Sequence, residues 1–235
     1  YLGESGLGRS AFDAAQKPEG TATYPWHLAN CGDLDILGNK RPQSHYRDFV
    51  WSGRTKPYLC AQHPARFAQQ EELSAWGWPE LEESWTFPGY EGRMVRVTVY
   101  SAGDEVRLLL DGAPVASGGV TDYRTVMEIP YRPWELTAVS LRDGKELGRT
   151  SMRTAKEAVG FRVEAESSWG GAYRFLHITA VDEDGLRVPN FAQRVAASVE
   201  GASLAALGGA DPKGETNYTS GEAEPAQGRL LLVIK

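Results

Sequence analysis

The sequence predicts a mainly β protein built from two β-sandwich domains of the immunoglobulin-like type, preceded by a loop-and-helix segment. Apolar and polar residues alternate with period two over residues 95–99 and 106–110. Asp-Gly turn pairs begin at Asp111 and Asp143, where a hairpin would reverse the chain. The 235 residues, 41% of them hydrophobic, are enough for two domains with filled cores.

The first sandwich is expected within residues 63–154. Beyond the two alternating runs, strands are predicted at residues 126–131, 136–141 and 146–152. Five or more short strands separated by turns are typical of a β-sandwich.

The second sandwich is expected within residues 155–235, after a linker near residues 154–159. Its predicted strands are residues 161–166, 175–182, 194–200, 203–207 and 229–234. An immunoglobulin-like sandwich has about seven strands. Truncation of this domain at Lys235 therefore stays open.

The first 62 residues are irregular, except for one short helix predicted near their end. Pro42 suits the first turn of a helix, and Tyr46, Phe49 and Val50 follow at the spacing of one helical face. The forty preceding residues supply no sheet to cover that face, so we expect its partner to be a domain outside this chain. Since no initiator Met is present, we interpret the sequence as a piece of a larger protein.

Composition narrows the classes of partner. The net charge is −6 and no basic cluster occurs, so nucleic acid is a poor partner. The longest apolar run, residues 230–234, is too short for a membrane span. Cys31, Cys60 and the four histidines lack metal-ligand spacing, so no metal and no cofactor is predicted, and two buried thiols are the simpler interpretation. Periplasm, cell surface and cytoplasm all remain open as compartments.

Carboxylates that could carry acid–base chemistry are few in the irregular N-terminal part. Glu4, Asp33 and Asp35 are the candidates, and the last two would share a face in an extended segment. Acidic residues in Gly-rich loops more often bind local backbone amides, and we favour that role. Ser5 lies between glycines but lacks the strand-turn-helix context of a nucleophile elbow.

An aromatic group marks the connector before the first sandwich. It can be interpreted as a platform that stacks on sugar rings, or as large side chains that hold a domain junction together, and the junction is favoured. Its members are Trp76, Trp78, Trp85, Phe87 and Tyr90.

The run from Cys31 to Trp51, CGDLDILGNKRPQSHYRDFVW, resembles the end of the (β/α)8 barrel in glycoside hydrolase family 2, the β-galactosidase family. Residues 1–4 resemble the segment that leaves the eighth barrel strand. Residues 84–92, 97–101 and 105–112 resemble the sandwich that follows the barrel in one bacterial subgroup, and the last 75 residues resemble an immunoglobulin-like or invasin-like domain. On this resemblance, residues 1–62 are a barrel remnant with its last helix.

The resemblance implies that both catalytic glutamates lie upstream of this chain, which alone is expected to be inactive. The parent enzyme is expected to hydrolyse terminal β-galactosides with retention. Its barrel, of the same polypeptide, and carbohydrate are the implied partners, and a homo-oligomer is open. Since active sites of such barrels lie at the C-terminal ends of the strands, the candidates for the pocket rim are Tyr1, Glu4, Trp26, His27 and Asp33.

Substrate choice depends on one short motif. Glucuronidases of the family read the sugar carboxylate with Asn-x-Lys, and the matching slot here is Ala29-Asn30-Cys31, without the lysine. A galactosidase is therefore preferred to a glucuronidase as the parent. A carbohydrate-binding or surface-adhesion module, and a plain spacer, are the alternatives from other classes.

Overall fold

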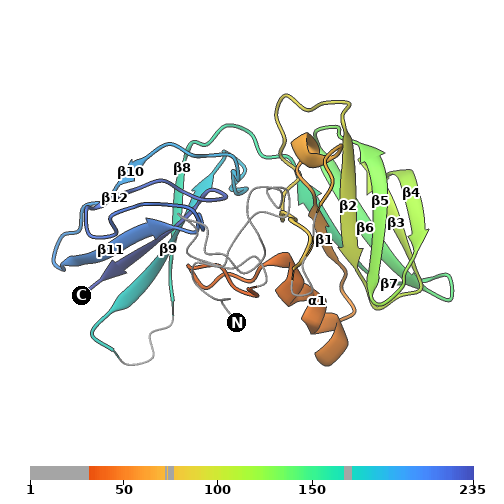
Figure 1. Ribbon diagram of the computed structural model, residues 1–235, viewed down its shortest axis with the longest axis horizontal. Coiled ribbons are helices and arrows are strands. Elements are labelled where there is room, and N and C mark those ends of the chain that lie inside the picture. Colours follow the sequence, from red (N-terminus) through yellow and green to blue (C-terminus); the bar gives the residue numbers. More distant parts are fainter. Residues whose placement is uncertain (1–31, 72, 74–76, 167–170) are drawn as a thin grey trace.

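The computed structural model describes residues 32–71, 73, 77–166 and 171–235. Two β-sandwich bodies lie side by side, with helix α1 at the inner edge of the first body (Figure 1). The predicted mainly β class with two sandwiches is confirmed. Helices in the described ranges are too short and polar to cross a lipid bilayer.

Helix α1 (Pro42–Trp51) forms where the sequence predicts a helix, with Pro42 in its first turn. Phe49 is 2% exposed and packs with Tyr46 against Tyr58 and Tyr100 of the first sandwich. The expectation that the helix needs a partner from outside the chain is therefore wrong for this face, because the sandwich covers it.

The end of α1 differs from the predicted apolar face. Val50 is 43% and Trp51 78% exposed, whereas the polar Gln43 is 2% exposed. Gln43 is buried because its amide donates to the carbonyl of Gly32, which satisfies the side chain inside the protein.

The first sandwich has two antiparallel sheets. One has the order β1 (Tyr58–Ala61), β2 (Met94–Tyr100), β5 (Arg124–Pro130), and the other the order β4 (Ala113–Gly119), β3 (Glu105–Leu110), β6 (Glu135–Arg142), β7 (Lys145–Arg153). Both Asp-Gly turns have positive φ at both residues, as a type I′ hairpin turn requires.

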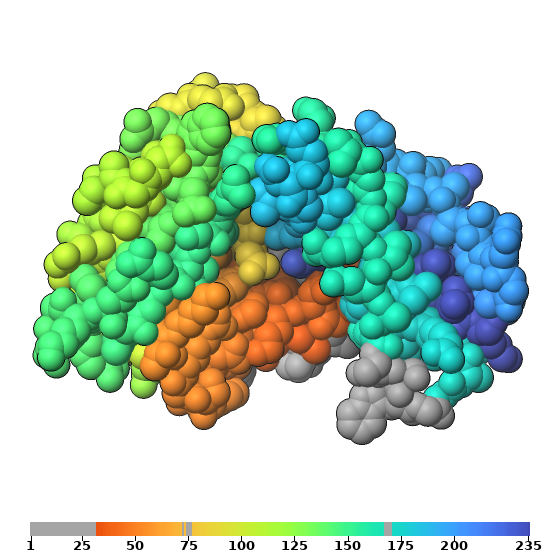
Figure 2. Space-filling model, turned by 180° about the vertical axis from the view of Figure 1, so that it is seen from behind, coloured from red at the N-terminus to blue at the C-terminus, as the bar shows by residue number. Residues whose placement is uncertain are grey.

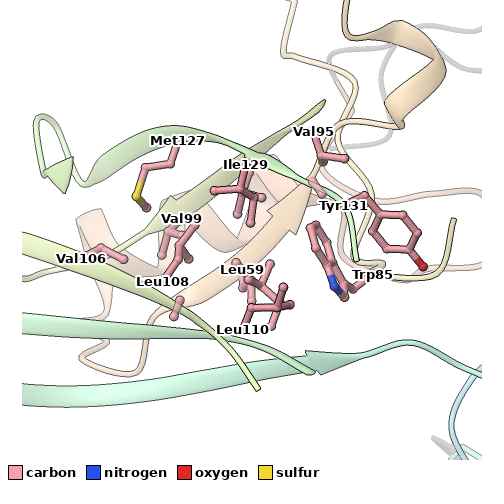
Figure 3. Packing of buried hydrophobic residues seen from close by; sticks show 14 of the residues in the cluster. Leu59, Trp85, Val95, Val99, Val106, Leu108, Leu110, Met127, Ile129 and Tyr131 are labelled. Carbon is pink, nitrogen blue, oxygen red and sulfur yellow. The ribbon is translucent and has the colours of Figure 1, made fainter. Parts of the chain in front are cut away.

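The core of this sandwich gathers the inward residues of both sheets (Figure 3). Val95 and Val97 pair with Ile129 and Met127, so the alternation seen in the sequence places the valines on one buried face. Trp85 closes one end of the core with 0% exposure.

Strand β1 lies before residue 63, the expected start of this domain. Its register pairs Tyr58 with Tyr100 and Ala61 with Val97, so the sandwich begins at Tyr58. All four residues of β1 are buried, and a strand buried on both faces shows no alternation in the sequence. The 3-10 helix η2 (Pro64–Arg66) follows it.

The second sandwich has a four-stranded sheet and a two-stranded one. The larger has the order β11 (Leu204–Gly209), β13 (Arg229–Ile234), β9 (Arg174–Val181), β8 (Gly160–Ala165), and the smaller pairs β10 (Val195–Ala196) with β12 (Glu222–Ala223). The strand predicted at 194–200 shortens to two residues. Beyond Ala196 the facing residue is Gly221, whose φ of +80° takes that segment out of the extended conformation.

Candidate functional site

The candidate site is a cleft of about 750 Å³ between the first turn of α1, the connector before β2 and loops of the second sandwich. A hollow between the two sandwiches is visible in Figure 2. Nearly half of its lining residues are charged, and they come from segments far apart in sequence, among them Asp35, Lys40, Glu80, Glu82, Glu83, Arg187, Asp211 and Arg229.

A tight turn before α1 forms one wall of the cleft. Asp35 Oδ1 accepts hydrogen bonds from the amides of Leu37 and Asn39, each at 2.9 Å. Gly38 has φ +82°, a conformation that favours glycine, and it completes the turn. The Asp35 carboxylate therefore stabilises the turn by binding local backbone amides, which is the role favoured from the sequence.

Asp33 lies beside this turn and pairs with the helix. Its Oδ1 accepts from Arg47 Nε at 2.9 Å, and its side chain is 17% exposed. The Gly32 carbonyl next to it accepts from Arg41 Nη1 at 2.9 Å. Of the five pocket-rim candidates, Asp33 is the one within the described residues, and the structure places it in this ion pair.

Asp48 is a second charged centre on α1. Burial acts to raise its pKa, but the hydrogen bond from Lys40 Nζ at 2.7 Å and the charges of Lys40, His45 and Arg54 hold the pKa below its usual value. Burial lowers the pKa of His45, which stacks on Tyr58 with ring centroids 4.0 Å apart. The His45–Asp48 contact at 3.5 Å is thus made mainly by a neutral imidazole near neutral pH.

The floor of the cleft joins the connector to the second sandwich. Arg187 donates through Nη1 to the Gln227 carbonyl at 2.9 Å and through Nη2 to the Glu83 carbonyl. Arg229 Nη2 lies 3.5 Å from Glu83 Oε2. Burial, followed by the nearby charge of Arg229, lowers the pKa of Arg187 to about 10, so the guanidinium stays charged at neutral pH.

Glu82 is the acid of this floor with a raised pKa. Burial raises it, while the hydrogen bond with Gln227 and the charge of Arg187 act in the opposite direction. A perturbed carboxyl group in a cleft is a candidate for acid–base work. Its hydrogen bond with Gln227 and its contact with the Arg187 charge are also what a structural network between the sandwiches would contain. Glycoside hydrolysis with retention, by comparison, needs two carboxyl groups about 5 Å apart.

The aromatic group divides between core and surface. Trp85 and Phe87 are buried at 0% and 1% exposure, so neither face can stack on a sugar. Trp78 and Tyr90 are partly exposed, and Tyr90 contacts His63 edge to face at 5.1 Å. Tyr1, Glu4, Trp26, His27 and Trp76 lie outside the described residues.

Buried polar contacts beside Trp85 support the junction interpretation for the connector. The Trp85 carbonyl accepts from Thr154 Oγ1 at 2.7 Å, and Thr86 Oγ1 accepts from the Ala155 amide at 2.9 Å. These bonds fix the start of the linker between the sandwiches to the first core.

Metal and thiol chemistry have little support in the described ranges. No three His, Cys, Asp or Glu side chains gather there as metal ligands would. Burial raises the pKa of the Cys60 thiol, which donates weakly to the Thr98 carbonyl. Cys60 is thus a buried packing residue, while Cys31 lies outside the described residues.

Comparisons with known proteins match this architecture over most of its length. A family profile described as a domain of unknown function, DUF4982, matches residues 92–148. A solved structure of a glycosyl hydrolase family 2 member from Bacteroides cellulosilyticus is 30% identical over 88% of this chain, with a TM-score of 0.78. Another from that organism, determined from microfluidic crystals, is 28% identical over 96%, with a TM-score of 0.82.

By fold and sequence, the chain is similar to members of glycoside hydrolase family 2. It spans less than a third of these relatives, 29% of the first structure and 31% of the second. A Formosa agariphila protein named "Putative beta-glucuronidase" is 24% identical over 161 residues, which are 67% of this chain and 12% of that protein.

The candidate-site residues that the sequence did not indicate are those of the cleft floor. Glu83 and Arg187 are 104 positions apart, and neither belongs to a recognisable motif. Only the packing of two sandwiches brings them together, so no local signal could have found them.

Proposed function

We propose that the chain is the non-catalytic C-terminal part of a family 2 glycosidase whose two catalytic glutamates lie upstream of it. The observation that carries this proposal is the use of Asp33 and Asp35. One forms an ion pair with Arg47 and the other holds a turn, so these acids build the scaffold at α1. The role of the chain is to anchor the last barrel helix on the first sandwich.

In the whole enzyme, one upstream carboxylate attacks the anomeric carbon, and the other protonates the leaving oxygen and then activates water. Terminal β-galactosides are the proposed substrates, since the segment Ala29-Asn30-Cys31 lacks the lysine of the glucuronidase motif. The cleft floor keeps the second sandwich in place behind this scaffold.

The test compares the 235-residue chain with a longer polypeptide that includes the upstream sequence. We expect the longer protein to hydrolyse p-nitrophenyl β-galactoside and the pure chain to show no turnover. Turnover by the chain itself, retained through repeated purification, refutes the non-catalytic role.

A β-glucuronidase is the second candidate, favoured by the name of the Formosa relative. The same longer polypeptide distinguishes the two through kcat/KM for p-nitrophenyl β-glucuronide and β-galactoside. A preference for the glucuronide by tenfold or more replaces the galactosidase proposal.

A carbohydrate-binding role for the aromatic group has weaker support, since Trp85 and Phe87 are buried. Of the group's described members, Trp78 and Tyr90 are partly exposed. Calorimetric titration with galactan tests this role: binding lost in Trp78→Ala, with folding intact, supports it.

A further inference from the structure

Strand β8 forms one edge of the larger sheet in the second sandwich. The sheet order ends at β8, and within the described residues no other strand pairs with its outer side. Residues 161–165 are all exposed, and the space-filling view shows the segment around them at the surface (Figure 2). An exposed edge of this kind is a template for pairing with another strand.

The hydrogen-bonding pattern shows which backbone groups face outward. The Glu166 amide donates to the Phe175 carbonyl at 2.9 Å, and the register pairs Ala165 with Leu176. Since antiparallel pairs alternate, the even-numbered residues of β8 turn their N–H and C=O toward β9. Phe161, Val163 and Ala165 therefore turn theirs to the free edge.

Two side chains of opposite charge flank Val163 on β8. The sequence Phe161-Arg162-Val163-Glu164-Ala165 reads apolar, basic, apolar, acidic, apolar. The register with β9 puts Arg162 opposite Thr179 and Glu164 opposite His177, on the polar face of the sheet. The three odd-numbered residues lie on the other face.

We propose that β8 pairs antiparallel with β8 of a second copy of this chain, with the two-fold axis at Val163. In that register Val163 exchanges both backbone hydrogen bonds with its own copy, and Phe161 does so with Ala165. Arg162 then faces Glu164 of the second copy, and the contact occurs twice by symmetry.

Charge complementarity supports a second copy as the occupant. Arg162 and Glu164 face one another across a pair without backbone hydrogen bonds, where Cα atoms approach to about 4.5 Å. Their side chains are 47% and 61% exposed, and within one chain they already lie 3.3 Å apart. Pairing therefore turns two exposed ion pairs into a ladder of four alternating charges.

The apolar face gains cover in the same arrangement. Val163 is 56% and Phe161 44% exposed, and Phe161 rests edge to face on Phe191 at 5.6 Å. In the dimer Val163 meets its copy, and Phe161 meets Ala165. The contact is small, so the dimer is expected to be weak and concentration-dependent.

The test measures molar mass by sedimentation equilibrium of the full chain from low micromolar to near-millimolar concentration. Unaltered chain is expected to rise from the monomer mass of 25.7 kDa toward twice that value. Arg162→Glu places two acids opposite each other, and Glu164→Arg places two arginines opposite each other. Each variant alone is expected to dimerise at least about tenfold more weakly.

An equimolar mixture of the two variants is the decisive arm. One copy then carries acids at both positions and the other carries arginines, so every cross-strand pair is attractive again and the mixture is expected to dimerise. Restored dimerisation also shows that both variants are folded. A chain that is monomeric throughout, or single variants that dimerise like the unaltered chain, overturns the proposal.

Discussion

Asp33 Oδ1 lies 2.9 Å from Nε of Arg47, and this pair joins the turn before α1 to the second turn of the helix. The two residues are 14 positions apart, so the bond closes a loop that includes the whole Asp35 turn. The helix in turn carries Phe49 into the aromatic cluster on the first sandwich. The charged pair thus holds the turn against the helix, and Phe49 attaches the helix to the sheet.

This pair is expected to contribute measurably to stability. Removing Asp33 and Arg47 singly and together, by alanine substitution in a double-mutant cycle, should give a coupling energy of about 1 kcal/mol, because both side chains are partly buried. Urea unfolding provides the measurement. Arg47 also contacts Trp78, and the energy of that contact cancels out of the coupling energy in the cycle.

The control for that cycle is the exposed pair Glu146–Arg149, whose side chains are 39% and 59% exposed. Solvent screens this pair, and no coupling is expected there. Equal coupling in the two pairs would contradict a structural role specific to Asp33.

Trp85 is expected to act as a core residue. Its indole donates to the Arg132 carbonyl at 3.0 Å and meets Tyr131 edge to face at 5.1 Å. Trp85→Ala should lower the free energy of unfolding by about 3–5 kcal/mol, since it leaves a large cavity. Trp78→Ala, at a partly exposed position, should cost less than about 1 kcal/mol. Thermal unfolding followed by circular dichroism compares them, and similar losses would argue against this division of the aromatic group.

Arg187 is expected to control how firmly the sandwiches dock. Its side chain is 15% exposed and bonds both the connector and the Gln227 loop. Arg187→Met should weaken docking by about 1–3 kcal/mol, because charged hydrogen bonds are lost and Glu83 keeps fewer partners. Faster proteolysis in the linker near residues 154–159 and a larger radius of gyration by X-ray scattering would report it.

Arg194→Met is the matched control for docking. Arg194 is 64% exposed and pairs with Glu222 and Glu224 inside the second sandwich. Its loss should leave linker proteolysis unchanged. If linker proteolysis became equally faster in both variants, the cause would be the loss of an arginine in general. It would then not be the loss of the junction contact.

Local rules predicted the elements that carry their own signal. The period of two predicted β2 and β3, and the Asp-Gly pairs, which have positive φ in the structure, predicted two hairpins. Pro42 indicated the start of α1. Strand β4 had no predicted run of its own, because its residues APVASGG are small and weak strand formers that depend on pairing with β3.

The features that the sequence could not predict depend on contacts between residues far apart in the chain. Val50 has the helical spacing of a buried residue, yet it is 43% exposed. Glu83 meets Arg187 only after two separate sandwiches have formed. The scaffold role of Asp35 could be favoured early, because its partners are within four residues, while Arg47 could not be assigned to Asp33 by spacing alone.

Asp182 is expected to make stability depend on pH in the acid range. Its side chain is 2% exposed, and it accepts from the amides of Lys156, Asp184 and Leu186 at 2.9, 3.0 and 2.9 Å. Burial acts to raise the pKa, but these three donors outweigh it and hold the pKa below the ordinary 3.8. The carboxylate thereby clamps the linker to the second sandwich.

Because the folded pKa is lowered, this stabilisation is complete above the unfolded value and is lost as the pH falls through the folded one. Asp182→Asn should therefore lower the free energy of unfolding at neutral pH by about 1–2 kcal/mol, measured by urea unfolding. The difference in free energy between the variant and the unaltered chain should shrink below about pH 4. Asp184→Asn removes a neighbouring charge but none of the three hydrogen bonds. If both variants showed the same pH-dependent difference, net charge and not the clamp would be its source.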